Sequence, residues 1–547
     1  MSRKSNSWIK WILITILITI IYVFFGQMKY LEPEDYVFTG TVAGISGEND
    51  LQYFLHPYFS VFLGYILGIA ANATGIFNFY AIFILSMYTL VFIGMHYLAA
   101  KCENTRLIHL AVIVFQLLLA RYLTYTSLSY LGIGVFVLYV YIRSDRKKFL
   151  VDVFFLLLAI IGILMRGEVL FTTILMLFPC ILKPIFEERK YKFFAIGCAL
   201  AITLIGIGSS YCNQIAYRAD DIWNSYYDWN AASTNVRDFA AIDYEKYAGI
   251  FHEVGWSPND LNLVNSWKYI DLNTFNEENL ITVAKAVSLS DRYELNVFHI
   301  VFGMIRQKTS LVLLACSLLF LLSQKKPKGI LDWIWNLTVY IAPIGLMGAL
   351  FLRQRYVERI AVPILILGLL QMFILNKAGT LQRDKLLRFM SIICCLCLVF
   401  IAEIRFVKTA DENKHQELSN YIASTEDILY VTNSGLANEL ICADAIIDID
   451  ESNYYPNVLK LGSWDSYSKR YYNQIHKYNV EDPDNMLHAL AVEENVRLLT
   501  QFPEDCEALQ KYLNEHYNLE GQFVIECIFD DSSVIYHWQE DMTSLRK

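Results

Sequence analysis

The segment FLVDVFFLLLAIIGILMRGEVLFTTILMLFPCILKPIF, residues 149–186, indicates what kind of protein this is. Two apolar runs, 148–165 and 168–186, fill it, and each is about long enough to cross the hydrocarbon core of a membrane as a helix. Between Val153 and Ile181 its only charged residues are Arg166 and Glu168, at the junction of the two runs. Adjoining apolar runs with charge confined to their junction are typical of a polytopic membrane protein.

The composition of the whole chain supports this prediction. Of its 547 residues, 55% are hydrophobic and 18% are charged, whereas about a quarter of an ordinary globular chain is charged. This composition excludes a disordered chain, a nucleic-acid binder, a disulfide-stapled secreted domain and a single-pass receptor. Residues 406–547 hold 26 acidic residues against 10 Lys and Arg, although the whole chain carries a net charge of only −9. An acidic tail on an apolar body predicts a membrane protein with one soluble domain.

Hydropathy predicts eleven transmembrane helices within residues 1–405, and the positions of Lys and Arg predict their orientation. The predicted spans are 8–26, 78–100, 107–122, 127–143, 148–165, 168–186, 193–212, 309–323, 330–352, 357–376 and 386–405. With the N-terminus inside, the cytoplasmic segments carry 20 Lys and Arg and the short outer segments carry 6. This asymmetry requires the apolar stretch Pro57–Ala71 to lie on the outer face as a juxtamembrane or re-entrant helix. The first span is expected to be an uncleaved anchor.

The loop 213–296 and the tail 406–547 are then expected outside the membrane. In the loop we expect short helices at Ala240–Tyr247, Trp256–Trp267 and Glu277–Val287, with Ser257-Pro258-Asn259-Asp260 as a helix start. In the tail we expect strands at Ile428–Thr432, Asp444–Ile449, Phe523–Phe529 and Ser533–Trp538, and helices at Asn413–Ile422, Ser466–His476, Asn485–Val492 and Glu504–His516. This pattern predicts a small α/β domain. The Tyr and Trp residues of the outer loops are expected mostly at the membrane interface.

Two acidic residues at the start of the first outer loop are candidates for a general base. Glu34 and Asp35 lie in Glu32-Pro33-Glu34-Asp35-Tyr36, directly after the first predicted span. A carboxylate within about 3 Å of an acceptor hydroxyl can take its proton, and a neighbouring acid raises the pKa of one member of the pair. The alternative is a solvated loop, because carboxylates at a membrane surface cost little where water reaches them.

Arginines on the predicted outer side are candidates for binding a phosphate or diphosphate. Arg166 lies between two apolar runs, where ionisable residues usually face a polar cavity. Arg353, Arg355 and Arg359 lie close together between two predicted spans. Arginine can hold a phosphate through two parallel hydrogen bonds, which favours this role. The alternatives are a structural pair of Arg166 with Glu168 and a plain surface loop at 353–359.

The chain contains none of the motifs of soluble nucleotide chemistry. It has no P-loop, GxSxG, HExxH or dinucleotide fingerprint, and its eleven Cys show no zinc-type spacing. Nucleotide sugars are not available outside the membrane. An enzyme that transfers sugars there needs a lipid-carried donor.

These features together resemble the GT-C superfamily of glycosyltransferases, which use polyprenyl-phosphate sugars. The shared pattern is a first span, an outer loop with an acidic pair, an apolar helix opened by His56-Pro57, many short-looped spans and a soluble C-terminal domain. Three segments resemble polytopic members of that superfamily from low-GC Gram-positive bacteria. They are Glu34–Gly40, the loop from Asn235-Val236-Arg237 through Asp243-Tyr244 to Trp267, and Arg353–Pro363. The resemblance covers residues 8–376.

The resemblance implies roles for particular residues. Asp35 or Glu34 would activate the acceptor, with Asp35 favoured, and Arg359 would bind the donor phosphate with help from Arg353, Arg355 and Arg166. Arg237, Asp243 and His56 would belong to the acceptor side. Relatives often have two Asp at the acidic pair and an acid in the second outer loop, where this chain has Leu123-Thr124-Tyr125-Thr126-Ser127. No metal ligands are therefore assigned, and a divalent cation such as Mg²⁺ or Mn²⁺ stays an open expectation.

The predicted reaction moves one sugar from an undecaprenyl-phosphate donor to a hydroxyl of a cell-envelope glycan or lipid, with inversion. It would take place at the outer face of a bacterial plasma membrane, and the partners are the donor, the acceptor and membrane lipid, without nucleic acid. One alternative is a polysaccharide polymerase or ligase, which would depend more on arginines. Another is a transporter or flippase of a lipid-linked glycan, which would show charges within paired spans and an inverted repeat. A non-catalytic scaffold is the third.

Overall fold

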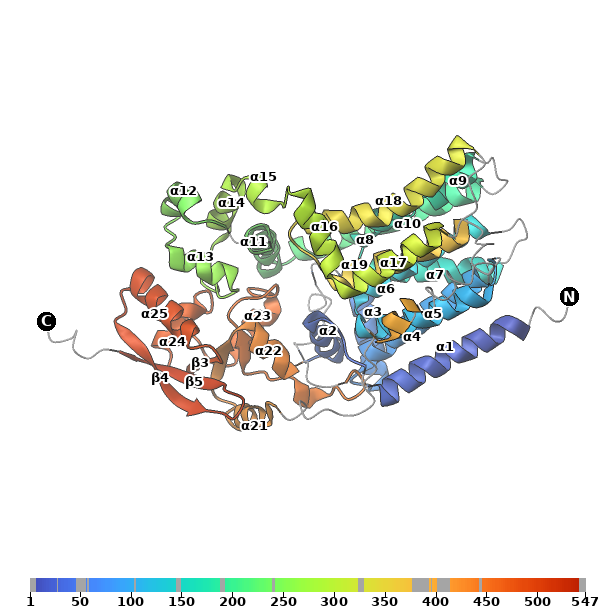
Figure 1. Cartoon of the computed structure of the whole chain (residues 1–547). Coiled ribbons are helices and arrows are strands. Elements are labelled where there is room, and N and C mark those ends of the chain that lie inside the picture. The colour runs from blue at the N-terminus through green and yellow to red at the C-terminus, as the bar shows by residue number, and fades with distance from the viewer. Residues whose placement is uncertain are drawn as a thin grey trace.

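The computed structural model describes residues 6–26, 28–45, 56, 59–102, 105–143, 149–186, 192–238, 242–322, 329–375, 393–394, 396–400, 414–441 and 445–540. Within these residues the chain is mainly helical and contains one small sheet. A bundle of apolar helices forms one end of the molecule and a mixed α/β body forms the other (Figure 1).

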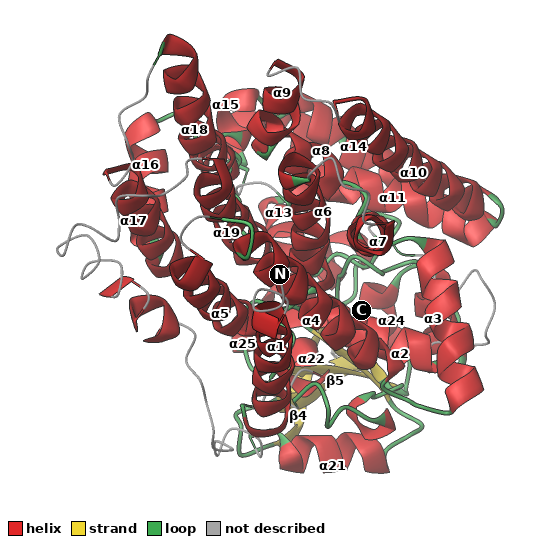
Figure 2. Cartoon of the chain, turned by 90° about the vertical axis from the view of Figure 1, so that its right-hand side faces the viewer, coloured by secondary structure: helices red, strands yellow, loops and turns green. Residues whose placement is uncertain are grey.

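The bundle is built around helix α6. Its helices are α1 (Asn6–Phe25), α4 (Phe79–Ala99), α5 (Thr105–Arg121), α6 (Tyr125–Ile142), α7 (Phe149–Met165), α8 (Val169–Met176), α9 (Phe178–Phe186), α10 (Lys192–Arg218), α16 (Val297–Arg306), α17 (Lys308–Leu322), α18 (Ile330–Leu352) and α19 (Glu358–Leu375). Helix α6 is buried from Tyr125 to Tyr141 and contacts α4, α7, α8 and α19. The view along the bundle shows these helices around it (Figure 2). Helix α6, including its N-terminus, is therefore packed within the bundle and shielded from solvent.

Several helices are long and apolar enough to cross a membrane. Among the described residues four helices qualify, namely Phe79–Ala99, Tyr125–Ile142, Ile196–Arg218 and Glu358–Leu375. The bent pair Ser290–Arg306 and Lys308–Leu319 gives a fifth if it is one span. Shorter apolar helices occur at Lys10–Phe25, Val61–Thr74, Ile108–Arg121, Phe149–Met165 and Leu337–Leu352. The architecture is compatible with a membrane location.

The prediction of eleven spans is not confirmed. The predicted span 168–186 consists of two short helices, α8 and α9, because Pro179 lies in the first turn of α9, where a proline starts a helix but cannot continue the preceding one. The predicted span 386–405 lies mostly outside the described residues. The apolar stretch 57–71 corresponds to the short helix α3 (Val61–Thr74). Its place on the outer face stays a prediction.

The tail contains a mixed five-stranded sheet. Its strands are β1 (Leu429–Thr432), β2 (Val458–Lys460), β3 (Val496–Thr500), β4 (Gly521–Ile528) and β5 (Val534–Glu540), in the order β2-β1-β3-β5-β4. Strand β1 runs parallel to β2 and β3, whereas β4 and β5 form an antiparallel hairpin. The predicted strands at 428–432, 523–529 and 533–538 are present as β1, β4 and β5. Strands β2 and β3 were not predicted.

The predicted strand Asp444–Ile449 is wrong. Its described part, residues 445–449, forms a turn. Ile446 and Ile449 are buried in the core of the helix bundle instead of in the sheet, and the Ile446 amide donates to the Met28 carbonyl at 2.8 Å. The apolar residues that suggested a strand therefore attach the tail to the start of the first outer loop.

The tail helices are α21 (Gln416–Ser424), α22 (Ser434–Ile441), α23 (Lys469–His476), α24 (Met486–Val492) and α25 (Pro503–Tyr517). Four of them, α21, α23, α24 and α25, match predicted helices. The outer loop holds α11 (Asp221–Arg237), η2 (Glu245–Tyr247), α12 (Ala248–Glu253), α13 (Pro258–Asn265), α14 (Glu277–Ala286) and α15 (Leu289–Arg292). The predicted helices at 256–267 and 277–287 are confirmed. In the predicted helix 240–247, the described residues form only the 3-10 turn η2. The predicted helix start at Ser257 forms a capping box with Asp260.

The outer loop and the tail pack into one α/β body. Trp229, Trp256 and Tyr269 from the loop share a buried core with Leu498 and Tyr512 from the tail. These aromatic side chains therefore lie in a protein core, which corrects the expectation of an interfacial position.

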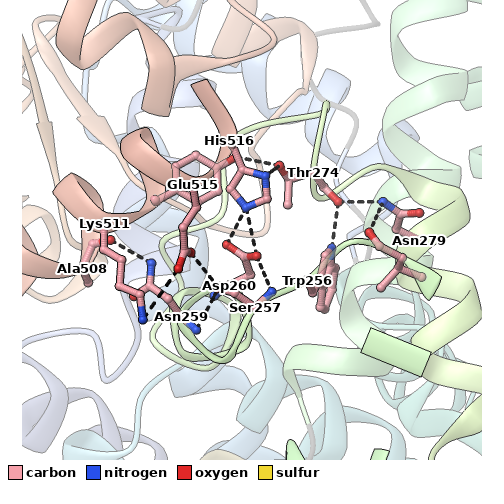
Figure 3. A network of polar contacts seen from close by, with 12 residues as sticks. Trp256, Ser257, Asn259, Asp260, Thr274, Asn279, Ala508, Lys511, Glu515 and His516 are labelled. Atoms are coloured by element: carbon pink, nitrogen blue, oxygen red, sulfur yellow. Dashed lines mark hydrogen bonds and ion pairs between the residues drawn. The ribbon is translucent and has the colours of Figure 1, made fainter. Parts of the chain in front are cut away.

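A polar network joins helices α13 and α25 at the boundary between loop and tail (Figure 3). His516 Nε2 lies 2.9 and 3.0 Å from the two carboxylate oxygens of Asp260. The Ser257 hydroxyl donates to Glu515 at 2.8 Å, and the Asn259 side-chain Nδ2 donates to the Ala508 carbonyl at 2.9 Å. The network fixes the two segments to each other.

Candidate functional site

The acidic part of the first outer loop forms helix α2 (Pro33–Ala43), which lies between the bundle and the α/β body (Figure 1). Pro33 occupies the first turn, where a missing amide hydrogen is tolerated. Glu34 and Asp35 also lie in that turn, where the helix dipole favours carboxylates. Helix α2 contacts α3 and α4 of the bundle and α22 of the tail. It therefore places three acids, Glu32 included, at the junction of the two parts.

Asp35 is completely buried at this junction. Its Oδ1 accepts hydrogen bonds from the Tyr80 hydroxyl at 2.7 Å and from the Tyr125 amide at 3.2 Å. Its Oδ2 has no hydrogen-bond partner among the described residues. Burial raises the pKa of Asp35 well above its usual value, against the opposing effect of the two hydrogen bonds. Asp35 connects α2 to α4 and α6 and has no access to solvent.

Arg359 lies against the other two acids. Its Nη1 is 2.5 Å from Glu32 Oε2 and 3.4 Å from Glu34 Oε2. The three side chains are between 12% and 24% exposed, so the group is largely but not completely shielded from water. Burial raises the pKa of Glu32, while the charges of Arg359 and Arg166 oppose that shift. The structure thus brings together Glu34 and Arg359, two residues that the sequence analysis singled out separately.

Arg166 lies at the junction of α7 and α8, close to the same acids. Its Nη1 donates to Thr126 Oγ1 at 2.9 Å, and its Nη2 lies 3.5 Å from Glu168 Oε2. The guanidinium is 5.9 Å from the centre of the Tyr125 ring. The pair of Arg166 with Glu168 exists, but Glu168 is 62% exposed and screened by solvent. The site therefore has one guanidinium group, that of Arg359, in contact with Glu32 and Glu34, and a second, that of Arg166, close enough for its charge to act on the pKa of Glu32.

The second outer loop connects these charged residues, and the sequence analysis missed its role. The Leu123 carbonyl accepts from the Leu31 amide at 3.0 Å, the Tyr125 amide donates to Asp35, and the Ser127 hydroxyl donates to the Arg359 carbonyl at 2.9 Å. The four hydroxyl residues of this stretch are fully buried, namely Thr124, Tyr125, Thr126 and Ser127. Four consecutive hydroxyl residues beside an apolar run were a detectable signal.

A cavity of about 460 Å³, called the first cavity below, opens beside the acids. Its lining includes Glu32 and Glu34 from the bundle side and Trp267, Lys268, Asn433, Ser434, Lys460, Ser463 and Trp464 from the α/β body. The Lys268 ammonium group is paired with Asp505. The volume is within the range of small-ligand sites. Asp35 does not line the cavity, whereas Glu34 does.

His56 lies behind the wall of the first cavity. It is 1% exposed, and its ring contacts the Trp464 ring edge-on at a centroid distance of 4.4 Å. Burial lowers the pKa of His56, and the charges of Arg470 and Arg166 lower it further. This environment therefore favours the neutral form of the imidazole. The imidazole supports an aromatic side chain that lines the cavity.

Arg237 and Asp243 belong to the structure of the outer loop. Arg237 is buried, donates to the Tyr269 hydroxyl at 2.8 Å and lies 4.5 Å from the Trp267 ring centre. It therefore supports the Trp267 wall of the first cavity. Asp243 accepts from the Glu245 amide at 3.0 Å at the start of η2 and does not line the cavity.

The arginines of the turn between α18 and α19 occupy different places. Arg353 is exposed, and Arg355 Nη1 lies 2.5 Å from Asp238 Oδ2 at the end of α11. Of the three predicted arginines in this turn, only Arg359 is in contact with the acids of α2 among the described residues.

One group among the described residues has the composition of a metal site. The ligand atoms of Asp260, Glu515 and His516 lie within 4.8 Å of one another (Figure 3). Asp260 already binds His516 and the Ser257 backbone amide, and Glu515 accepts from the Ser257 hydroxyl. None of the three lines the first cavity. The expectation of a divalent cation at the acids of α2 stays a prediction.

Comparisons with known proteins do not assign this chain to a family. A scan against family models, a search of curated proteins and a search of solved structures each found no match. The fold and the site define a class of protein. It is a helical protein with several helices able to span a membrane, and Glu32, Glu34 and Arg359 form an acid–arginine cluster between the helix bundle and an α/β body. Its function has to be argued from the chemistry of that cluster.

Proposed function

We propose that this chain is a membrane glycosyltransferase that moves a sugar from a polyprenyl-phosphate donor to an acceptor hydroxyl. The observation that carries the proposal is the contact of Arg359 with Glu32 and Glu34 beside the first cavity. Glycosyl transfer needs a base for the acceptor proton and a cation for the leaving phosphate, both close to the anomeric carbon. The cluster supplies both kinds of group in one place.

On the acceptor side, Glu34 is the better candidate for the base. It lines the first cavity, and its side chain is 15% exposed. Asp35, which the sequence analysis favoured, is fully buried, and one of its oxygens is occupied by Tyr80 and the Tyr125 amide. We assign Asp35 a positioning role, since it fixes the first turn of α2 and with it the Glu34 side chain.

On the donor side, Arg359 would hold the phosphate and Arg166 would assist it. The donor is a phosphodiester monoanion, and it becomes a phosphate dianion as its bond to the sugar breaks. A guanidinium that offers two parallel hydrogen bonds therefore binds the departing phosphate more strongly than the intact donor. The acceptor oxygen attacks the anomeric carbon while the bond from that carbon to the phosphate oxygen breaks. The proton goes to Glu34, and the electron pair leaves with the polyprenyl phosphate, which Arg359 stabilises. The products are an inverted glycoside and the lipid phosphate.

The site is proposed to face the outer side of a bacterial plasma membrane, with a cell-envelope glycan or lipid as acceptor. The excess of Lys and Arg in the opposite loops of the predicted topology supports this orientation. A polymerase or ligase would be expected to use several arginines together. Arg353 and Arg355 lie away from the acids in an exposed turn, which favours the transferase.

Donor binding tests the proposed phosphate site. The purified chain in detergent should bind an undecaprenyl-phosphate monosaccharide, chosen by screening several sugars, and Arg359→Ala should weaken that binding about 10- to 100-fold, the effect of losing charge-assisted hydrogen bonds. Arg353→Ala, a change of the same residue type six positions away in an exposed turn, is the matched control and should have little effect. Equal donor affinities for the two variants would reject the assignment of Arg359.

A further inference from the structure

A second cavity, of about 400 Å³, adjoins the first. It lies between the middle of α2, represented by Val37, and the segment of the tail around strand β2 and helix α23. Lys460 and Ser463 line both cavities. The two cavities therefore share part of their walls.

The second cavity concentrates positive charge in an acidic domain. The tail 406–547 has 10 Lys and Arg against 26 acids, yet four of the ten lie within the 18 residues 460–477, together with a single acid, Asp465. Lys460, Arg470 and Lys477 line the cavity. Asp465 also lines it, but its carboxylate accepts a hydrogen bond from the Ser463 hydroxyl. A local excess of cations in a domain of net charge −16 indicates an anionic ligand.

Arg470 is built into the wall of this cavity. Its side chain is 8% exposed, and its guanidinium lies 5.4 Å from the Trp223 ring centre and 5.6 Å from the Trp464 ring centre. Two aromatic rings fix the position of the guanidinium, so that little entropy is lost when it binds an anion. Trp464 lines the first cavity and contacts Arg470, a residue that lines the second.

The spacing along α2 relates the two cavities to each other. Glu34 lines the first cavity and Val37 lines the second. Three residues of an α-helix correspond to a rise of about 4.5 Å, which is close to the length of one sugar or polyol unit. Glu34 lines the first cavity and Lys460 lines both, so a hydroxyl beside Glu34 and a charged group beside Lys460 can belong to one ligand chain.

We propose that the second cavity binds an anionic group of the acceptor, and that the acceptor is an anionic glycan chain bearing phosphodiester or carboxylate groups. Its terminal hydroxyl lies beside Glu34, and its next charged unit is bound by Lys460, Arg470 and Lys477. The position of the hydroxyl rests on the proposed transferase function. The binding of the anion rests only on the second cavity.

Binding of charged and neutral oligomers tests this inference. The probes for the full chain in detergent are an oligo(glycerol phosphate), an oligogalacturonate and a dextran oligomer of matched length, measured by microscale thermophoresis. We expect at least one anionic probe to bind tenfold or more tighter than dextran. Preference for the phosphodiester or for the carboxylate identifies the anion, and either result supports the proposal. Equal affinity for all three probes would overturn it.

Two charge-removing variants locate the binding. Lys477→Gln, at an exposed position of the cavity lining, should weaken the favoured anionic probe about fivefold. Lys511→Gln, also in the tail but 56% exposed and outside both cavities, should leave the affinity unchanged. Equal losses in the two variants would show non-specific attraction and overturn the proposal.

The outcome is independent of catalysis. If the chain transfers no sugar but the anionic probe binds and depends on Lys477, the transferase proposal fails and the anion site stands. If transfer occurs with equal affinity for charged and neutral acceptors, the anion site fails and the transferase proposal stands.

Discussion

At the scale of single residues, the difference between Glu34 and Asp35 is the main result. The two carboxyl groups are adjacent in the sequence, and sequence patterns alone did not separate their roles. Helix α2 turns Glu34 toward the first cavity and Asp35 toward Tyr80 and the Tyr125 amide. The hydropathy pattern placed Glu34, Asp35 and Arg359 near the ends of apolar runs, where the structure has them. Their contact could not be predicted, because it depends on how α19 packs against α6.

Asp35→Asn tests the buried carboxyl group. Asn still offers an acceptor to Tyr80 and the Tyr125 amide, but it does not ionise. Because the pKa of Asp35 is raised in the folded chain, its contribution to stability is complete below about pH 4 and is lost as the pH rises through the folded pKa. As the pH rises from 4 to 7, the free energy of unfolding of Asp35→Asn should therefore increase relative to that of wild type by about 1 kcal/mol or more. Tryptophan fluorescence during thermal unfolding measures it, and a pH-independent difference would contradict the assignment.

At the scale of elements, helix α2 forms one of the contacts between the bundle and the tail. The Tyr454 hydroxyl donates to the Tyr36 carbonyl at 2.6 Å, and the Tyr454 ring lies directly over Gly40. A Cβ at residue 40 would be 2.5 Å from the ring. The glycine is therefore required for the close approach of α2 and the tail, and this approach shapes the side of α2 that faces the second cavity.

Gly40→Ala should destabilise the chain by about 1–3 kcal/mol, because the added methyl group forces the tyrosine ring to move. Gly249→Ala in α12 is the matched control, since a Cβ there meets no atom within 4 Å. The control should be neutral or slightly stabilising, because alanine is a better helix former than glycine. If the melting temperatures of the two variants shift equally, the contact of Gly40 with the Tyr454 ring is not the cause of the destabilisation.

The elements also show where sequence analysis succeeds and fails. Long apolar runs such as 79–99 were found as helices because their length and composition leave few alternatives. Helix α11 was missed because its buried stripe consists of Trp223, Tyr226 and Trp229, which were expected at a membrane interface. Strand β2 has only three residues, and its pairing with β1 is a long-range property.

At the scale of the whole molecule, the α/β body is assembled from two distant segments. The outer loop supplies Trp267 and Lys268 to the first cavity, and the tail supplies Lys460 and Trp464. The His516–Asp260 contact holds the two segments together (Figure 3). Burial disfavours the charged imidazole, but the hydrogen bond and charge of Asp260 outweigh burial and raise the pKa of His516.

This ion pair should make the α/β body less stable at higher pH. A raised folded pKa means that the stabilisation is complete below about pH 6.5 and is lost as the pH rises through the folded pKa. We expect wild type to lose roughly 1 kcal/mol relative to His516→Gln between pH 6 and pH 9. Thermal unfolding at several pH values measures this difference. A difference that grows in the opposite direction would contradict the ion pair.

The central claim is that Glu34 and Arg359 act together in glycosyl transfer beside the first cavity. The most direct measurement is consumption of an undecaprenyl-phosphate monosaccharide by membranes that contain wild type, Glu34→Gln or the control Glu168→Gln, with a cell-envelope acceptor present. Loss of a general base should lower the transfer rate at least about 100-fold in Glu34→Gln with donor affinity retained. Glu168→Gln, which changes an exposed partner of Arg166, should transfer nearly as fast as wild type. Full transfer activity in Glu34→Gln would contradict the proposed mechanism.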